Sequence, residues 1–314
     1  MMSAPAHSHC SPTPTISVII TSYNSRRTID MCLNSLRPTM DQPPAEIILV
    51  ENSLDGTEAH VRSQFPFVRL IHLPERVFLG KGRNIGAKAA SGSILAFTDA
   101  DCVVAPDWLD AICRSFVEHP DQDACAGCIE NHNPHSAASW VSFLTEFNGY
   151  IGRVRRHPTR HLPGYSIACR RSVFEEVGGF PEDVAGLEDM LLTTKWLGRG
   201  ARLFIEPTIR VAHHNRERLR DFFRHQRKLG RDFALSRFRA DMPGARALRA
   251  TAMSIPVLAL WRMARAFERT FRGGVYLGLL LVALSPLYIL GMVVWASGVW
   301  AGRRDCVRDL RKTV

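Results

Sequence analysis

Two aspartates, Asp99 and Asp101, follow directly on the apolar run Ile94–Phe97. Carboxylates one residue apart at the end of a buried strand leave the sheet in a loop, where both can reach one hard cation. Magnesium and manganese prefer oxygen ligands and keep open positions for substrate phosphates. On these residues alone, a metal site and a solvated or capping turn stay open as alternatives.

Two further acidic segments could do chemistry. In the segment Glu51–Thr57 an acid at a strand end can accept bonds from a nucleoside base or ribose, or Ser53 or Asp55 can cap the next helix. Glu188 and Asp189 open a helix after a loop rich in glycine and proline. Acids in a first turn favour the helix dipole, and a carboxylate on a rigid helix could equally act as a base.

His213 and His214 close a short apolar stretch. A histidine in such a place is more often structural, although neutral imidazole is the commonest nitrogen ligand for a metal already held by acids. The run Gly80–Gly86 superficially resembles a dinucleotide fingerprint, but no long β-run leads into it and no acid follows at the expected place. It is better interpreted as a glycine-rich helix start with a basic side chain near phosphate.

The elements that carry these residues alternate along the first hundred positions. The expected strands are Ile16–Thr21, Glu46–Val50, Val68–His72 and Ile94–Thr98. The helices expected between them run from Asn24 or Ser25 to Leu36, over Thr57–Gln64, and within Gly80–Gly92. Strands separated by helices predict a parallel sheet with ligands at the carboxyl ends of its strands. The fold class is therefore α/β.

The second half has a mixed pattern. The expected strands are Asp123–Glu130, Ser166–Arg170, Arg202–Glu206 and Ile209–Val211, and the expected helices are Arg171–Val177, Asp189–Leu197 and the basic amphipathic Glu217–Arg239.

These segments, in this order, resemble the family 2 glycosyltransferases with the GT-A fold. The match covers roughly residues 16–235, and the order of the motifs makes it specific. The matching segments are Ser17–Asn24, Glu51–Thr57, Gly82–Gly86, Asp99–Asp101, Val177–Phe180 before Glu188-Asp189, and Pro207 before Val211–His213. The resemblance implies a mixed, mainly parallel sheet flanked by helices.

The resemblance also implies a role for each site residue. In the donor site, Glu51 contacts the nucleoside base, Arg83 the diphosphate region, Asp99 the ribose and metal shell, and Thr21 and Tyr23 line the opening turn. Asp101 is the principal metal ligand, with His213 as a further metal or phosphate contact. Asp189 is the general base, and Glu188 lies beside it for acceptor or sugar hydroxyls.

The implied reaction is an inverting transfer of one sugar from a nucleotide-sugar to a hydroxyl of a lipid-linked or cell-envelope glycan. The donor is expected to be UDP-linked, and Mg²⁺ or Mn²⁺ is expected to assist the transfer. Gln226–Gly230 lacks the Q-x-x-R-W of processive synthases, so a polymerase is not expected. Two other classes stay open: a metal-dependent nucleotide-sugar phosphatase or nucleotidyl enzyme, and a non-catalytic membrane scaffold with a vestigial nucleotide site.

Charge and composition point to a membrane partner. The chain has 314 residues, 46% hydrophobic, with a net charge of +10. Arginines cluster in Arg216–Arg239 and around the apolar C-terminal stretch, as on a surface that faces anionic lipid. No helix-turn-helix, zinc finger or basic-aromatic RNA motif is present in the sequence, so nucleic acid is not an expected partner. The eight cysteines are expected to be reduced cytosolic thiols, since residues 1–15 lack the apolar core of a signal peptide.

The stretch Val275–Trp300 contains no charged residue, and as a helix it is long enough to span a bilayer with tilt. A straight span would export the basic tail after Trp300, against the positive-inside tendency. Pro286 can break the helix, so a re-entrant or tight hairpin that returns the tail is expected. The expected division is a disordered leader (1–15), a GT-A domain (16–240) and a membrane-associated region (241–314). The protein is expected at the cell inner membrane, with its catalytic domain on the cytoplasmic side.

Overall fold

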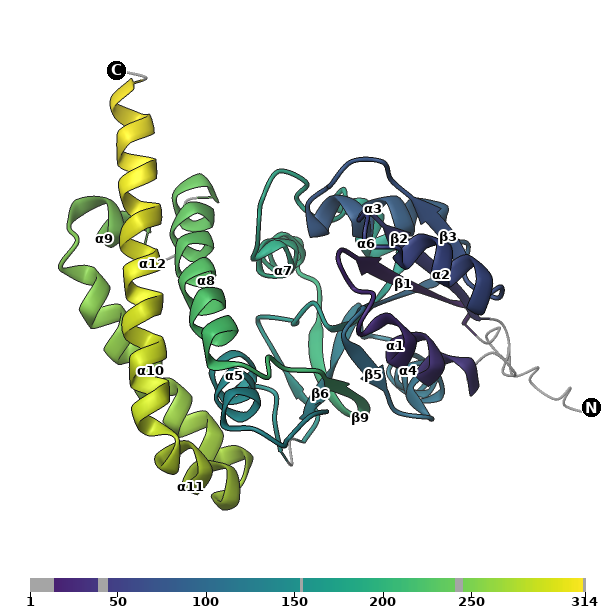
Figure 1. Ribbon diagram of the computed structural model, residues 1–314. Coiled ribbons are helices and arrows are strands. Elements are labelled where there is room, and N and C mark those ends of the chain that lie inside the picture. Colours follow the sequence, from purple (N-terminus) through teal and green to yellow (C-terminus); the bar gives the residue numbers. More distant parts are fainter. Residues whose placement is uncertain (1–13, 39–44, 153–154, 241–244, 313–314) are drawn as a thin grey trace, which may run out of the picture.

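The computed structural model describes residues 14–38, 45–152, 155–240 and 245–312, so nearly all of the expected leader at 1–15 lies outside the described residues. Its centre is a nine-stranded sheet in the order β3-β2-β1-β4-β8-β6-β9-β5, with β7 paired to β9. Figure 1 shows helices on both faces of this sheet and a group of long helices at one side.

The strands are β1 (Ile16–Ser22), β2 (Ala45–Glu51), β3 (Arg69–His72), β4 (Ile94–Asp99), β5 (Cys102–Val104), β6 (Ala124–Asn131), β7 (His157–Pro158), β8 (Ser166–Arg170) and β9 (Leu203–His213). The helices are α1 (Ile29–Leu36), α2 (Thr57–Gln64), α3 (Leu79–Ala89), α4 (Trp108–Glu118), α5 (Ala137–Phe147), α6 (Arg171–Glu176), α7 (Glu188–Gly198), α8 (Leu219–Ala240), α9 (Ala245–Ala250), α10 (Ser254–Gly273), α11 (Val275–Ala283) and α12 (Ser285–Lys312).

The first half of the sheet is parallel, as predicted. β1 pairs in parallel with β2 and β4, and β2 pairs in parallel with β3. Every residue of β1 is buried, because helices cover both faces of this part of the sheet. Since parallel strands end at the same edge, the polar residues that close β1, β2 and β4 (Ser22, Glu51 and Asp99) gather there.

The second half of the sheet is mixed. β8 is antiparallel to β4 and β6, whereas β6 and β9 run in parallel with a register shift after Gly127. A side chain at Gly127 would put a Cβ 2.3 Å from the carbonyl oxygen of Ile209, so this close approach requires glycine. The short strand β5 is antiparallel to β9 and sets Cys102 opposite His213. This pairing brings the loop with Asp101 next to His213.

Several expected elements differ from the observed ones. The helix expected from Asn24 or Ser25 begins at Ile29, because Asn24 is left-handed (φ 55°) and the Ser25 carbonyl accepts hydrogen bonds from the amides of Thr28 and Ile29. The two short strands expected over 202–211 form one long strand, β9. No element was expected where β5, α4 and α5 lie. The helix α2 occupies the expected residues, Thr57–Gln64.

The apolar C-terminal stretch forms two helices that meet at Leu284, so the expected break is confirmed and a straight 26-residue helix is wrong. Pro286 lies in the first turn of α12, where its missing amide hydrogen costs nothing. The segment Ser285–Arg308 is long and apolar enough to cross a membrane, and 39% of its most apolar window is buried inside the protein.

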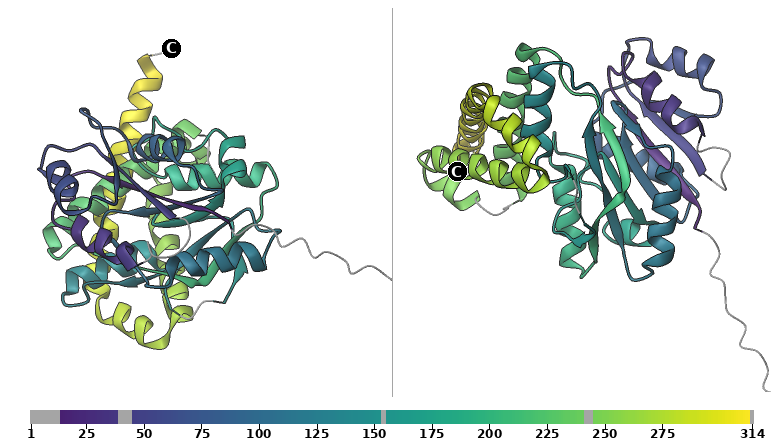
Figure 2. Two further views of the ribbon diagram at one scale, coloured as in Figure 1. Left: turned by 90° about the vertical axis from the view of Figure 1, so that its right-hand side faces the viewer. Right: turned by 90° about the horizontal axis from the view of Figure 1, so that it is seen from below.

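Helix α12 packs along α8, and the two lie side by side in both Figure 1 and Figure 2. The contact is close, because Cβ atoms at Gly230 and Gly298 would lie 2.0 and 2.1 Å from backbone oxygens of the facing helix. One stripe of α12 is buried in this contact and against neighbouring helices: Tyr288, Met292, Trp295 and Val299. Helices α8 to α12, which we call the helical group, are therefore built into the same hydrophobic core as one face of the sheet.

Candidate functional site

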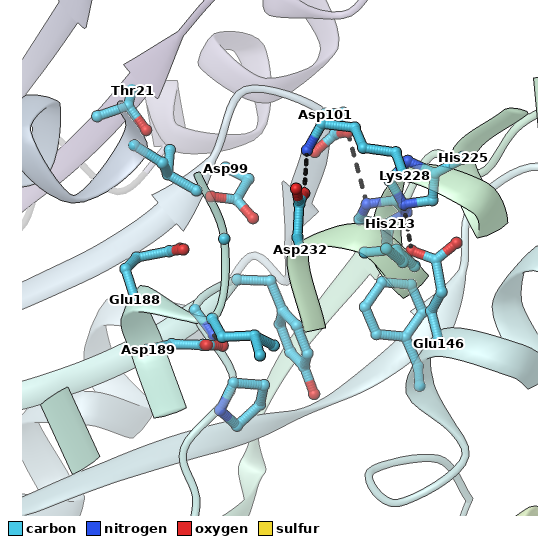
Figure 3. Close-up of a pocket in the computed structure, with 18 of the residues that line it drawn as sticks. Thr21, Asp99, Asp101, Glu146, Glu188, Asp189, His213, His225, Lys228 and Asp232 are labelled. Carbon is cyan, nitrogen blue, oxygen red and sulfur yellow. Dashed lines mark hydrogen bonds and ion pairs between the residues drawn. The ribbon is translucent and has the colours of Figure 1, made fainter. Parts of the chain in front are cut away.

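A cavity of about 730 Å³ lies at the carboxyl ends of β1 and β4, between α7 and the long helix α8. This volume is within the usual range for a small-molecule site, and its position at strand ends is the usual one in α/β proteins. Figure 3 shows acidic side chains of β4 and α7 along one side, and side chains of α5, α8 and β9 along the other.

Arg83 of α3 holds two of the acids. Its guanidinium donates hydrogen bonds to Asp99 (2.7 Å) and Glu188 (2.8 Å), and also to the carbonyl of Gly164 (3.2 Å). Arg83 is 1% exposed. It lines the cavity, but its hydrogen bonds go to protein groups, so the predicted contact with a diphosphate stays a prediction.

The surroundings of the two acids shift their ionisation. Burial raises the pKa of Asp99 and of Glu188, each is raised further by a neighbouring carboxylate, and the Arg83 guanidinium opposes the rise. Without Arg83, two carboxylates would lie close together in a partly dry site, which is unfavourable unless one is protonated. Arg83 therefore makes this cluster of acids possible.

Asp189 is held differently, at the start of α7. Its Oδ2 accepts a hydrogen bond from the amide of Gly164 (2.9 Å) and lies 3.6 Å from Nε2 of His161, while its Oδ1 accepts from the amide of Met190 (2.7 Å). Burial would raise the pKa of this carboxyl, but His161, Arg83 and the amide of Gly164 together lower it to about 2. Asp189 is therefore ionised in the cavity at neutral pH and can accept a proton.

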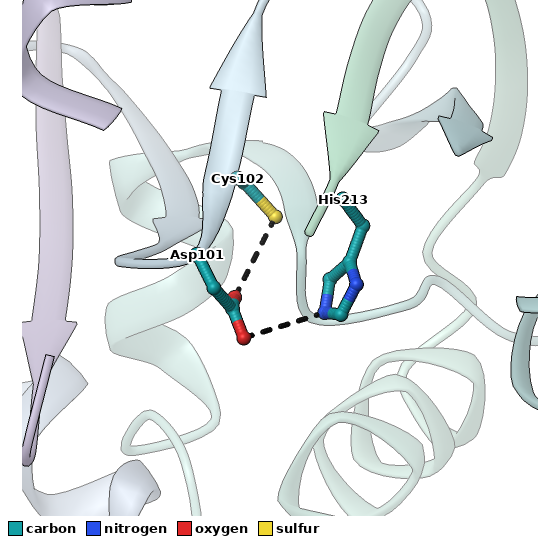
Figure 4. A group of neighbouring side chains, drawn as sticks. All are labelled: Asp101, Cys102 and His213. Atoms are coloured by element: carbon teal, nitrogen blue, oxygen red, sulfur yellow. Dashed lines mark hydrogen bonds and ion pairs between the residues drawn. The ribbon is translucent and has the colours of Figure 1, made fainter. Parts of the chain in front are cut away.

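Asp101 and His213 form a second pair, with Oδ2 of Asp101 3.5 Å from Nε2 of His213 (Figure 4). His213 is buried, and its Nδ1 lies 3.1 Å from the amide oxygen of Asn215. That oxygen can only accept, so Nδ1 carries the proton and Nε2 offers its lone pair towards Asp101. A histidine oriented in this way through its second nitrogen is the usual arrangement at a metal site.

The donor set fits a divalent cation. One ligand atom each from Asp101, His213 and Cys102 lies within 4.8 Å of the others. Burial, with the nearby Asp101 and Asp99, raises the pKa of the Cys102 thiol well above its usual range, which disfavours the thiolate form that binds metals. A carboxylate oxygen and an imidazole nitrogen remain, which suit Mn²⁺ or Mg²⁺ better than a thiophilic metal.

The remaining predicted donor residues fall into two groups. Thr21 and Tyr23 line the cavity, and the hydroxyl of Thr21 is buried with no partner among the described residues. Glu51 does not line the cavity. It is fully buried and accepts hydrogen bonds from Ser53 and His72, so the predicted contact with a nucleoside base would require these bonds to be exchanged. That contact stays a prediction.

Residues of α5 and α8 that were not among the predicted site residues line the opposite side of the cavity. Glu146 of α5 pairs with Arg216 (3.0 Å) and His225 (3.2 Å). Burial would raise the pKa of Glu146, but these two cations lower it below its usual range. Lys228 and Asp232 of α8 also line the cavity and pair at 2.7 Å. The amphipathic pattern of α8 marked a polar face, but nothing local marked Glu146.

Comparisons with known proteins agree with this geometry. The family model described as glycosyl transferase family 2 matches residues 17–178. The pre-mycofactocin glycosyltransferase of Mycobacterium tuberculosis is 29% identical over 160 residues, which are 49% of this chain and 34% of that protein. Glycosyltransferase AglE of Haloferax volcanii is 28% identical over 197 residues, 60% of this chain and 64% of AglE. The chain thus spans about a third of the mycobacterial relative.

Solved structures share the fold at low identity. Mannosyltransferase PcManGT from Pyrobaculum calidifontis, in complex with GDP-Man and Mn²⁺, has a TM-score of 0.57 at 22% identity and covers 95% of this chain and 88% of its own. TarS 1–349 of S. aureus, in complex with UDP-GlcNAc, has a TM-score of 0.53 at 18% identity, with coverage of 93% and 92%. These likenesses extend over the helical group as well as the sheet.

Proposed function

The chain belongs to glycosyl transferase family 2 and has the GT-A fold, and from this premise we propose that it is an inverting transferase that moves one sugar from a nucleotide-sugar to a hydroxyl of a lipid-linked or cell-envelope glycan. One observation carries the proposal. A single cavity holds an ionised carboxylate that can accept a proton, Asp189, and a carboxylate–imidazole pair suited to a cation, Asp101 and His213.

In the proposed reaction Asp189 is the general base. It takes the proton of the acceptor hydroxyl while that oxygen bonds to the anomeric carbon, and the bond to the nucleoside diphosphate breaks with its electron pair on the leaving oxygen. Glu188 lies beside Asp189 in the first turn of α7 and is proposed to orient sugar or acceptor hydroxyls. Because one oxygen replaces another from the opposite face, the configuration inverts.

The donor side is proposed to involve Thr21, Tyr23 and Asp99, with Asp101 and His213 holding Mg²⁺ or Mn²⁺. When bound, that cation would supply positive charge to the departing diphosphate. Arg83 keeps Asp99 oriented through the 2.7 Å ion pair. PcManGT was crystallised with GDP-Man and TarS with UDP-GlcNAc, so the donor nucleotide, expected from the sequence to be UDP, is a question for experiment.

We also propose that the helical group attaches the enzyme to the cytoplasmic face of the inner membrane, with the tail on the same side as the active site. Arg303 donates a hydrogen bond to the Leu248 carbonyl, and Arg231 of α8 pairs with Asp305 at 2.9 Å. These bonds support a tail that stays with the catalytic domain. A straight span with the tail outside would have to break them.

Large exposed apolar side chains support a surface that rests in the lipid interface. They lie on three consecutive helices: Val257, Leu260 and Trp261 on α10, Tyr276, Leu279 and Val282 on α11, and Ile289, Leu290, Val293 and Trp300 on α12. Helix α12 could cross a bilayer only with α8 alongside, and α8 carries exposed arginines such as Arg220 and Arg224. Charges of that kind are costly in hydrocarbon.

The test is a screen of UDP-, GDP- and dTDP-linked sugars by thermal shift with and without Mn²⁺, followed by product analysis. A transferase should be stabilised by one donor in the presence of metal, and should release the nucleoside diphosphate at full rate only with an acceptor. Phosphate or nucleotide release at the same rate without acceptor would indicate a phosphatase or nucleotidyl enzyme. The absence of any stabilising donor would indicate a vestigial site.

A further inference from the structure

The cavity has a second side that the proposed donor chemistry does not use. Helices α8, α10 and α12 supply seven of its lining residues, among them Lys228 and Phe233 of α8, Arg262 of α10 and Trp295 of α12. We refer to these four residues as the helical wall. It combines two cations with two aromatic rings, and it belongs to the same cavity as Asp189.

Arg262 is the unusual member of the helical wall. Its guanidinium lies 5.0 Å from the centre of the Trp295 ring, and it makes no hydrogen bond or ion pair with any described residue. Its neighbours on α10 behave differently, since Arg265 and Arg272 both pair with Glu268 at 2.7 Å. A guanidinium that lines a cavity without an acceptor has donors free for a ligand.

Other donors around Arg262 also lack acceptors. The indole Nε1 of Trp295 and the hydroxyl of Tyr288 are buried and have no hydrogen-bond partner among the described residues. Lys228 uses one of its three ammonium hydrogens on Asp232, at 2.7 Å. Buried polar groups are normally paired, and Trp295 lines the cavity, so its indole without an acceptor, beside the Arg262 guanidinium, indicates a ligand with oxygen acceptors.

Apolar surface adjoins these donors. Leu229, Phe233 and Trp295 line the cavity, and α10 and α12 carry exposed apolar residues, Leu260, Trp261 and Val293 among them, away from it. A ligand that satisfied the donors and also had an apolar chain would have protein or lipid surface for both of its parts. A free sugar phosphate would leave the apolar surface unused.

We propose that the helical wall is the acceptor subsite, and that Arg262, Lys228 and Trp295 bind the phosphate of a lipid-linked acceptor whose apolar chain leaves along α10 and α12. The inference rests on the proposed function, because it identifies the class of acceptor for the same reaction. Arg262 binds the acceptor and takes no part in proton transfer. The phosphate anchors the acceptor while its hydroxyl lies within the cavity near Asp189.

The experiment titrates the full chain in detergent with farnesyl phosphate, and in parallel with farnesol and with inorganic phosphate. Wild type should bind farnesyl phosphate at least about tenfold more tightly than either fragment. Arg262→Gln should lose about tenfold or more of that affinity, as expected for hydrogen bonds to a charged group. Arg262→Lys should retain part of it. The matched control is Arg272→Gln on the same helix, whose side chain is 74% exposed and pairs with Glu268, and it should bind like wild type.

The same samples are titrated with UDP, GDP and dTDP in the presence of Mn²⁺, which separates this inference from the proposed function and also shows that each variant is folded. If no nucleotide binds wild type, the proposed function fails. If nucleotide binds but farnesyl phosphate binds no better than farnesol or phosphate, the acceptor subsite alone is overturned. If Arg262→Gln weakens nucleotide binding and leaves farnesyl phosphate unaffected, Arg262 serves the donor diphosphate and the proposal is likewise wrong.

Discussion

The two sides of the cavity differ in how completely their charged side chains are paired within the protein. On the sheet side, Asp99 and Glu188 are paired with Arg83, and Asp189 is held by backbone amides and His161. On the helical wall, Lys228 pairs with Asp232, whereas Arg262 has no acceptor among the described residues. A side whose charges are already paired is organised for chemistry before any ligand arrives. The Arg262 guanidinium, by contrast, can gain a partner from a ligand.

The first prediction removes the proton acceptor from the sheet side. Asp189→Asn keeps the size of the side chain and its place beside the Gly164 amide, but it removes the negative charge. The turnover rate should fall by about 10²–10⁴-fold, the usual contribution of a positioned base. Nucleotide affinity in the presence of Mn²⁺ should stay close to that of wild type. Steady-state kinetics together with nucleotide titration measure both quantities.

The matched control for that variant is Glu176→Gln on α6, an exposed acid that pairs with Arg199 and lies away from the cavity. It should transfer sugar at the wild-type rate. Transfer at the wild-type rate by Asp189→Asn as well would remove Asp189 from the role of base, and Glu188 would then be the carboxylate to test.

The second prediction tests whether the sheet side depends on its internal pairing. Arg83→Met leaves Glu188 and Asp99 without their cation in a buried site, and breaking such a pair costs about 3–5 kcal/mol of the free energy of unfolding. The surface pair of Arg202 and Asp121, with both side chains 55% exposed, provides the control. Arg202→Met should change the free energy of unfolding by no more than about 1 kcal/mol. Urea titration of both variants measures the difference, and equal losses would refute the buried pairing.

The third prediction concerns Asn215, whose side-chain oxygen accepts a hydrogen bond from Nδ1 of His213. Asn215→Leu removes the acceptor that keeps the proton on Nδ1, so the lone pair of Nε2 is no longer fixed towards Asp101. Loss of such a partner typically lowers metal affinity by about 10–100-fold. Asn215→Asp retains the acceptor but loses the amide hydrogens donated to Asn131 and to the His213 carbonyl, so it should bind Mn²⁺ more tightly than Asn215→Leu. Direct Mn²⁺ titration by paramagnetic resonance gives the affinities, and unchanged binding by Asn215→Leu would contradict the assigned orientation.

The same division explains what the sequence could predict. β1, β2 and β4 are runs of β-branched and apolar residues that end in polar ones, so both the strands and the edge with Asp99 could be inferred. The three-residue strand β5 has no pattern of its own and exists because β9 lies beside it. Helix α4 does carry a signal in the sequence, since Trp108, Ile112 and Phe116 recur at helical spacing and are buried.

The chemistry of the site divides in a similar way. The motifs marked Asp189 and Asp101 as candidates, and the resemblance marked Arg83, but the partners of Arg83 could not be predicted because Glu188 is 105 residues away. Glu146 joins Arg216 and His225 across 70 and 79 residues. The residues of the helical wall come from α8, α10 and α12, which are likewise far apart in the sequence. No local spacing predicts which face of α8 contacts α12.

The last and smallest effect is expected where the helical wall is held together. A Cβ added at Gly298 would lie 2.1 Å from the backbone oxygen of Arg227, so Gly298→Ala must push α12 away from α8. Overpacking of this kind costs about 1–3 kcal/mol. Gly198 at the end of α7 has no atom within 4 Å of the same position, and Gly198→Ala should leave the stability unchanged or raise it slightly. Thermal unfolding in detergent compares the two variants.

The two glycine variants also test whether ligand binding on the two sides of the cavity can be changed separately. Trp295 lies on the same helix as Gly298 and belongs to the helical wall, so a displaced α12 should weaken binding of farnesyl phosphate. The sheet side has its own internal ion pairs and should still bind nucleotide and Mn²⁺. If Gly298→Ala weakened both ligands equally, the two sides would be one cooperative unit. If it weakened neither, α12 would be dispensable to the site, and its close packing on α8 would serve only to keep the tail beside the catalytic domain.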